Sequence, residues 1–159
     1  MMLSLKPLIA LLTPKPPGFE GHWFRKVGGA AEYAQARTEA LPLPMAWVIR
    51  FADPANPIGN GVADVDIAFD VVIAIENVRT KDSGETDDAL LRYRDAVNQL
   101  LLGFQLDGAL RPVSYKGGQM VDYTTSDLYY RDRYHMAMML DSYLPDPIPN
   151  SQPITVDKL

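Results

Sequence analysis

The sequence predicts an α+β domain with a mainly antiparallel, twisted sheet and helices packed on one face. Residues 64–79 (DVDIAFDVVIAIENVR) alternate apolar and polar side chains over much of their length, a pattern typical of one long strand with an apolar and an acidic face. Residues 86–104 carry apolar side chains at helical spacing. Residues 113–123 and 128–140 supply the strand patterns that complete the sheet.

The composition is that of one globular domain. The chain has 159 residues, of which 47% are hydrophobic and 22% charged, and a formal net charge of -5. This length suits a single core, and the negative charge disfavours a general nucleic-acid-binding protein. The absence of cysteine removes disulfides, thiolate metal sites and a cysteine nucleophile, and is compatible with assembly in a reducing cytoplasm. We expect no membrane contact, because no segment approaches the roughly 20 apolar residues that span a bilayer.

Prolines divide the chain into a regular middle and irregular ends. None of the thirteen prolines lies within residues 58–111, whereas four lie between residues 145 and 153. Proline is excluded from helix interiors and central strands, so the middle should hold the regular elements. We therefore predict a single domain over residues 1–144. Residues 145–159 should form a proline-rich C-terminal arm that is either disordered or lies on a neighbour.

In the first sixty residues the sequence predicts short elements separated by turns. A helix over residues 3–13 ends at a proline–glycine cluster, and a short strand over residues 23–27 precedes a Gly–Gly turn. Residues 30–36 (AAEYAQA) fit a small helix, and residues 45–51 fit a second strand with an apolar face. Residues 53–61 (DPANPIGNG) are rich in turn residues and are predicted to be a loop.

The helix predicted over residues 86–104 is the clearest single element. Thr86 is a suitable N-cap, and Asp87 and Asp88 lie in the first turn, where the helix dipole favours negative charge. Its buried stripe is expected to contain Leu90, Tyr93, Val97, Leu100, Leu101 and Phe104. In the strand that follows, Gly117–Gly118 indicates a bulge or a tight turn.

The last predicted strand has an apolar face, interrupted by Asp132, and a basic face. Opposite charges on two strand faces can pair within one sheet or across two subunits, and the second arrangement would form a charge-complementary interface. Tyrosine and arginine together also fit edge-strand packing or a nucleic-acid stacking platform, although the overall acidity disfavours the latter. The basic face carries Tyr129, Arg131, Arg133 and His135, and the acidic face of the 64–79 strand carries Asp64, Asp66 and Asp70.

The sequence contains no arrangement of residues that indicates catalysis, cofactor binding or metal binding. His22 and His135 have no further ligand at a recognised spacing, and the glycine pairs form no phosphate-binding motif. Helix-dipole compensation explains the adjacent acids at 87 and 88, and the serines lack a nucleophile elbow. We therefore predict a structural protein that is not an enzyme and uses no cofactor.

The order of these segments resembles the phage tail terminator proteins, also called tail completion or minor tail proteins. The order and spacing of several segments carry the resemblance, and these segments span residues 24–139: FRKVGGAAEYAQA, LPLPMAWVIRF, VVIAIENVR, RYRDAVNQLLLGF, RPVSYKGGQMVDY and DLYYRDRYHM. The resemblance implies an α+β subunit of a hexameric ring without catalytic activity. Such a ring caps the tail tube at the head–tail junction of the virion, stops tube polymerisation and docks head-neck proteins.

The resemblance also suggests partners, and charge and loop position suggest contact residues. The expected partners are further copies of the chain, the tail tube protein and a head-completion or neck protein, while genomic DNA passes through the ring without specific binding. Two alternatives remain, another neck or connector component and a small-ligand-binding α+β domain whose tyrosines line a pocket. The candidate subunit interface contains Asp64, Asp66, Asp70, Tyr129, Arg131, Arg133 and His135. The candidate tube or neck contacts are Asn56, Asn60, Lys81, Asp82 and Glu85.

Overall fold

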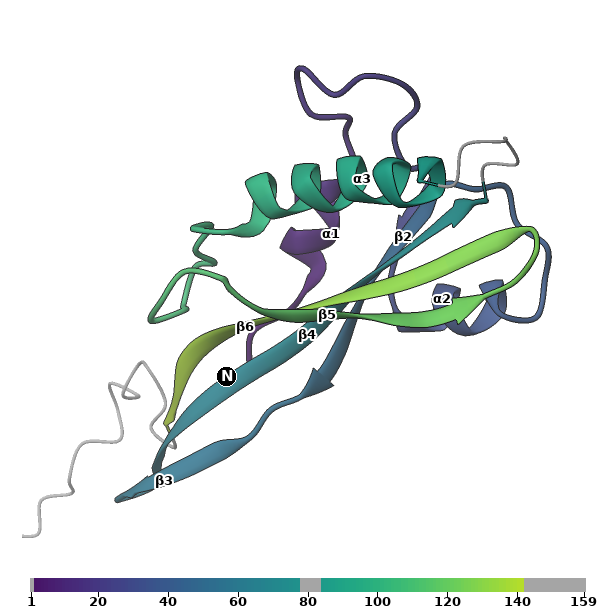
Figure 1. Cartoon of the computed structure of the whole chain (residues 1–159). Helices are drawn as coiled ribbons and strands as arrows, with labels where there is room; N and C mark the ends of the chain where they lie inside the picture. The colour runs from purple at the N-terminus through teal and green to yellow at the C-terminus, as the bar shows by residue number, and fades with distance from the viewer. Residues whose placement is uncertain (1, 78–83, 142–159) are drawn as a thin grey trace, which may run out of the picture.

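The computed structural model describes residues 2–77 and 84–141, and within them the chain forms an open sheet with three helices (Figure 1). The helices are α1 (Lys6–Leu12), α2 (Ala30–Ala36) and α3 (Glu85–Leu101). The strands are β1 (Val27–Gly28), β2 (Met45–Ala52), β3 (Ala55–Gly59), β4 (Val62–Glu76), β5 (Ser114–Tyr123) and β6 (Asp127–Asp141). The predicted α+β class is confirmed.

The sheet is built around a long pair of central strands. Its order is β1-β2-β4-β6-β5, and β3 pairs with β4 outside this path. β1 runs parallel to β2, and every other pair is antiparallel, as predicted. β4 and β6 each have 15 residues and pair from end to end, with Val62 opposite Asp141 and Glu76 opposite Asp127. The register of these two strands therefore decides which side chains meet across the centre of the sheet.

The two faces of the sheet bury different cores. On one face, which we call the helix face, alternate residues of β4 from Val65 to Ile75 pack against α1 and α3. On the other face, which we call the charged face, Trp47, Val72 and Tyr129 pack with residues of α2. α1 and α3 thus cover one face as predicted, whereas α2 lies on the opposite side (Figure 1). Because α2 covers this part of the charged face, the large apolar side chain of Trp47 is fully buried there.

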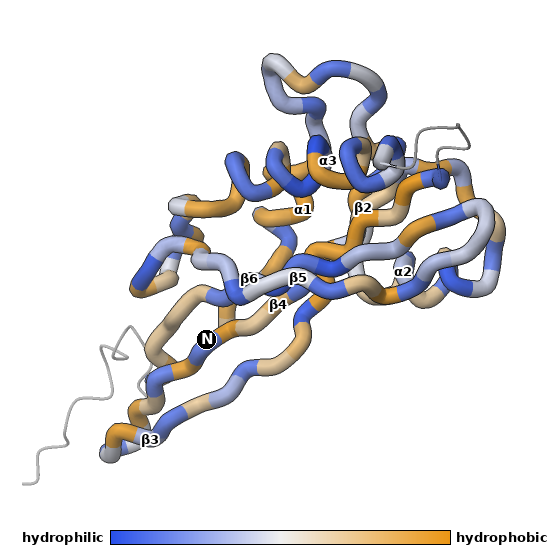
Figure 2. The backbone as a smooth tube through the Cα atoms, viewed as in Figure 1, coloured by the Kyte–Doolittle hydropathy of each residue, from blue (hydrophilic) through white to orange (hydrophobic). Residues whose placement is uncertain are grey.

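Helices α1 and α3 begin differently from the prediction. α1 is shorter than residues 3–13, because it starts at Lys6 with proline in its first turn, where the missing N–H is tolerated. α3 starts at Glu85 with Gly84 at the N-cap, so the prediction of Thr86 as the cap is wrong. The buried stripe of α3 is confirmed: Leu90, Val97 and Leu101 are buried, and Tyr93, Leu100 and Phe104 pack against the same core. Figure 2 shows apolar stretches along α1, β2 and β4, where these elements meet.

Two predictions in the first sixty residues are wrong. The expected strand over residues 23–27 is reduced to the two residues of β1, and Trp23 instead packs in a loop with its indole N–H donating to the carbonyl of Leu12 at 2.8 Å. The expected loop over residues 53–61 contains β3, which forms a hairpin with β4. Asn60 (φ 55) and Gly61 (φ 74) both lie in the left-handed region, which a two-residue type I′ hairpin turn requires.

The β3–β4 hairpin projects beyond the core, and we call it the arm (Figure 1). All five residues of β3 are exposed. Pro57 is tolerated in β3 because this strand lies at an edge of the sheet, and a proline there removes one N–H that another strand could bind. Ile58 is 55% exposed beside the turn. The outer strand of the arm, β3, is therefore open to solvent, while β4 remains paired with β6 along its whole length.

A buried carboxylate explains why Asp132 interrupts the apolar face of β6. Asp132 is fully buried on the helix face and accepts hydrogen bonds from Arg94 Nε at 3.0 Å, Arg94 Nη2 at 2.9 Å and the hydroxyl of Tyr115 at 2.7 Å. The hydrogen bonds to Asp132 hold the pKa of Arg94 above its usual value. The network joins α3, β5 and β6 at one point. The predicted bulge is confirmed beside it, between Tyr115 and Gly117.

Gly118 leaves the space that this network occupies. A Cβ at Gly118 would lie 2.5 Å from Asp132 Oδ1 and 2.8 Å from Arg94 Nη2. We expect Gly118→Ala to lower the free energy of unfolding by about 2–3 kcal/mol, measured by urea denaturation, because the buried ion pair must shift. Gly84→Ala is the control: its Cβ would meet nothing within 4 Å, and it should cost less than about 1 kcal/mol. Equal losses in the two variants would contradict the steric explanation.

Burial also affects tyrosine ionisation. Desolvation raises the pKa of Tyr33, Tyr93, Tyr115 and Tyr134 above the usual value, most of all for Tyr134. In the unfolded chain these groups ionise near pH ~10, so the folded chain binds more protons above that pH and loses stability as the pH rises. Ultraviolet titration at pH ~11 should count fewer tyrosinates in the native protein than in the urea-unfolded protein, in which all eight tyrosines are exposed to solvent. A full count in the native protein would refute the burial of these hydroxyls.

Candidate assembly surface

The charged face carries an ion pair at its centre. Asp70 on β4 lies directly opposite Arg133 on β6, and Arg133 donates from Nε to Oδ1 at 2.7 Å and from Nη2 to Oδ2 at 3.0 Å. Arg131 adds a longer contact of 3.8 Å to the same carboxylate. Asp70 is only 7% exposed, so the paired hydrogen bonds compensate its partial desolvation. The bond to Asp70 raises the pKa of Arg133.

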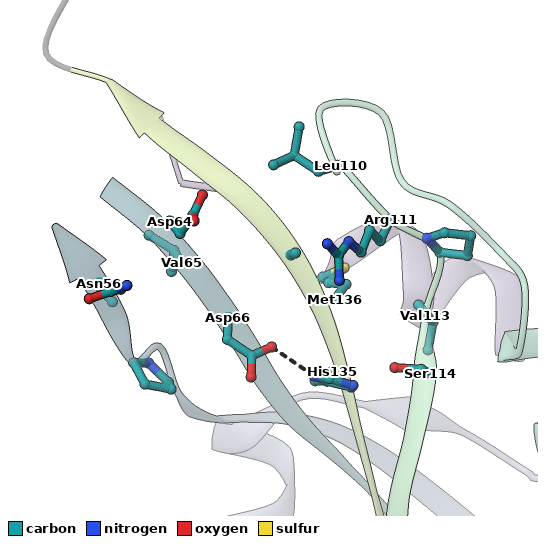
Figure 3. Close-up of a pocket in the computed structure, with 14 residues that line it drawn as sticks. Asn56, Asp64, Val65, Asp66, Leu110, Arg111, Val113, Ser114, His135 and Met136 are labelled. Carbon is teal, nitrogen blue, oxygen red and sulfur yellow. Dashed lines mark hydrogen bonds and ion pairs between the residues drawn. The ribbon is translucent and has the colours of Figure 1, made fainter. Parts of the chain in front are cut away.

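A second pair joins the same two strands nearer the arm. Nδ1 of His135 lies 2.8 Å from Oδ1 of Asp66, and both side chains are part-exposed (Figure 3). The structure therefore contains the first of the two arrangements that the sequence left open, in which opposite charges pair within one sheet. The assignment of these residues to a subunit interface stays a prediction. Asp70 and Arg133, however, already satisfy one another inside the subunit.

One aromatic ring lies beside the central ion pair of this row of charges, and another lies at one end of the row. The guanidinium of Arg133 stands 3.4 Å from the ring centroid of Phe51, which is 55% exposed. Tyr129, in contrast, is only 9% exposed, because it stacks on Trp47 at 6.1 Å and lies beneath the guanidinium of Arg37 at 4.6 Å. Tyr129 therefore contributes little free surface to the predicted interface, whereas Phe51, which the sequence did not single out, contributes more.

The predicted tube or neck contacts are divided between different places. Asn56 lies on β3 opposite Asp64, and Asn60 lies in the turn of the arm, so both are exposed at one end of the molecule. Glu85 begins α3, which starts at the other end of the sheet (Figure 1). Lys81 and Asp82 fall outside the described residues. The arm and the start of α3 are thus two separate candidate contact regions.

An open groove of about 820 Å³ runs beside the arm on the charged face. Figure 3 shows its three walls, which are β3, the central strands β4 and β6, and the segment that enters β5. Asp64, Asp66 and His135 contribute polar groups, and Leu110 and Arg111 stand on the far wall. Sequence reasoning missed Leu110 and Arg111, because they lie in a connection without a periodic pattern. Leu110 is fixed there by its N–H, which donates to the carbonyl of Ala137 at 2.8 Å.

The chemistry of this surface is that of ion pairs and apolar contact. Over residues 2–77 and 84–141, no group of three or more His, Cys, Asp or Glu side chains is arranged to hold a metal ion. No helix in the same ranges is long and apolar enough to cross a bilayer. In the groove, His135 and Asp66 are hydrogen-bonded to each other, so a ligand that used either group would have to compete with this bond.

The central ion pair should contribute to stability, and an unpaired acid on the same face supplies the control. We expect Asp70→Asn to lower the free energy of unfolding by about 1.5–3 kcal/mol, because the two arginines lose a charged acceptor. Asp64 is exposed, and its side chain has no partner among the described residues. Asp64→Asn should therefore change the unfolding free energy by no more than about 0.5 kcal/mol. Urea denaturation of the two variants side by side would contradict this interpretation if Asp64→Asn cost as much as Asp70→Asn.

A search among curated proteins found no match. The sequence model of one family, described as "Phage tail terminator protein", matches residues 3–144 of the 159. The match covers every helix and strand described above, including the arm and the charged face. The resemblance inferred from the order of the segments is thus confirmed, and the chain belongs to the phage tail terminator family, a family of structural, non-catalytic proteins of the phage tail.

Proposed function

We propose that this chain assembles into a hexameric ring that caps the tail tube of a phage, ends its polymerisation and offers the docking face for head-neck proteins. The family match, which extends over nearly the whole chain, is the observation that carries this proposal. The ring sits at the head–tail junction of the virion and assembles in the host cytoplasm. Its partners are the tail tube protein on one side and a head-completion or neck protein on the other.

The structure supports an assembly role through the surfaces it leaves open. The charged face is covered by α2 at one end only, and the arm and β5 form exposed edges of the sheet. These edges are protected against uncontrolled pairing: Pro57 stands in β3, and β5 has two irregularities in its register. A subunit that must stop growth of a tube needs edges of this kind, because open-ended strand pairing would extend the assembly.

The charge of the chain fits the passage of DNA. A ring of subunits that each carry a formal charge of -5 repels phosphate, so genomic DNA passes through without specific binding. We further propose that residues 1–144 act as one domain and that residues 145–159 form a proline-rich C-terminal segment, distinct from the β3–β4 arm, that contacts a neighbour. This C-terminal segment lies outside the described residues.

Tail length gives the sharpest test of the proposed function. In a phage that lacks this chain, tail tubes should grow beyond their normal length and fail to join heads, and electron microscopy of lysates measures both outcomes. Supplying the wild-type chain from a plasmid should restore tails of normal length and infectivity. Normal tails without the chain would refute the proposal. Tubes of normal length that fail only to bind heads would favour the alternative, a neck or connector component.

A further inference from the structure

The charges on the charged face are balanced in the middle and unbalanced at the ends. Asp70 and Arg133 neutralise each other at the centre. Towards β5, Arg131 makes only a longer contact with Asp70 and donates to the amide of Gln119, which carries no charge. Lys116 on β5 is exposed, and its side chain has no partner among the described residues. This end of the face therefore carries an excess of positive charge.

A hollow lies at this basic end. It has a volume of about 180 Å³ and is lined by Lys116, Gly117, Gly118, Gln119, Arg131 and Arg133. Gly117 has φ +124 and lies beside the bulge that breaks the register of β5, and a Cβ built there would meet nothing within 4 Å. Gly117 thus leaves the hollow open, whereas the missing side chain of Gly118 makes room on the helix face. Three cationic side chains surround it against the single carboxylate of Asp70, so it suits an acidic group.

The arm supplies acidic groups at the other end of the same face. Asp64 is exposed and unpaired within the described part of the chain, and Asp66 has only His135 as a partner. His135 and, on the far wall of the same groove, Arg111 are the cationic side chains nearest to these two carboxylates, and neither is bonded to Asp64.

Asp64 lies opposite Met139, and Arg131 is eight residues earlier on β6, which corresponds to about 26 Å along the strand. Lys116 stands beside residues 133–134 of β6, about 18 Å from Met139 along the strand and one strand further from β4. The two ends cannot reach each other within one subunit.

We propose that the arm of one copy of this chain docks onto the hollow of the next copy, with Asp64 pairing with Lys116 and Arg131. This inference rests on the proposed ring, because a ring closes through head-to-tail contacts that join two different patches. The acidic arm and the basic hollow are two such patches at opposite ends of one face. Only another copy can bring them together, and repeating the contact around an axis satisfies every subunit equally.

Charge exchange tests this contact. Asp64→Lys alone and Lys116→Asp alone each set like charges against each other at every interface. Light scattering after size-exclusion chromatography should show that either variant needs at least about tenfold more protein than wild type for half assembly. The combined variant Asp64→Lys/Lys116→Asp should recover, and so should a one-to-one mixture of the single variants, since alternating subunits restore each contact. Urea denaturation should show unchanged stability in both single variants, because neither side chain has a partner within residues 2–77 and 84–141.

Three outcomes would overturn the proposal in different ways. If wild type forms the ring and the single variants assemble equally well, the arm contact is wrong and the ring stands. If the recovered species is a closed dimer, the contact is reciprocal rather than head-to-tail. If wild type forms no ring, even with purified tail tubes present, both the ring and the contact are refuted.

An engineered disulfide provides a second readout, because the chain has no cysteine of its own. Asp64→Cys/Lys116→Cys should give, on oxidation, a ladder of linked copies on a denaturing gel, ending at the copy number of the ring. Asp64→Cys/Glu20→Cys is the matched control, because Glu20 is also exposed but lines a hollow against α3 rather than the charged face. A ladder of equal yield in the control would overturn the assigned contact.

Discussion

The fold depends on one buried carboxylate and the groups that satisfy it. Burying Asp132 in the middle of a core strand would be costly without partners, because an ionised group loses its hydration there. Arg94 supplies two hydrogen bonds from α3 and Tyr115 supplies one from β5, so the same requirement positions a helix and an edge strand. Arg94 also lies 4.2 Å from the ring centroid of Tyr130, which holds the guanidinium flat against the sheet. The position of β5 in turn forms the hollow on the opposite face.

On the charged face, too, charged side chains differ in whether they find a partner within the chain. Where strands are in register, as at Asp70 and Arg133, the charges find partners within the subunit and stabilise it. Where the strands end or bulge, as at Asp64 and Lys116, charges remain without partners in the described part of the chain. In the proposed ring, stability and association would therefore rest on different positions of one face.

Alternating patterns in the sequence predicted the long strands and the buried stripe of α3, because each pattern is local. Long-range pairing was not predictable in the same way: Arg94 and Asp132 are 38 residues apart, and Asp70 and Arg133 are 63 apart. Their contact depends on register and helix placement. The density of turn residues over residues 53–61 predicted a loop, whereas the segment contains a strand and a two-residue turn at Asn60–Gly61. An edge strand tolerates such residues, Pro57 among them, and edge position is again a property of the whole sheet.

The end-to-end pairing of β4 and β6 has a mechanical consequence. A pull on the arm along the direction of β4 stresses the hydrogen bonds of a 15-residue ladder in shear, so many bonds share the force at once. Peeling the strands apart from one end would break the same bonds one after another and needs far less force. A load applied through the arm along β4 would therefore act in the direction in which this ladder resists most strongly.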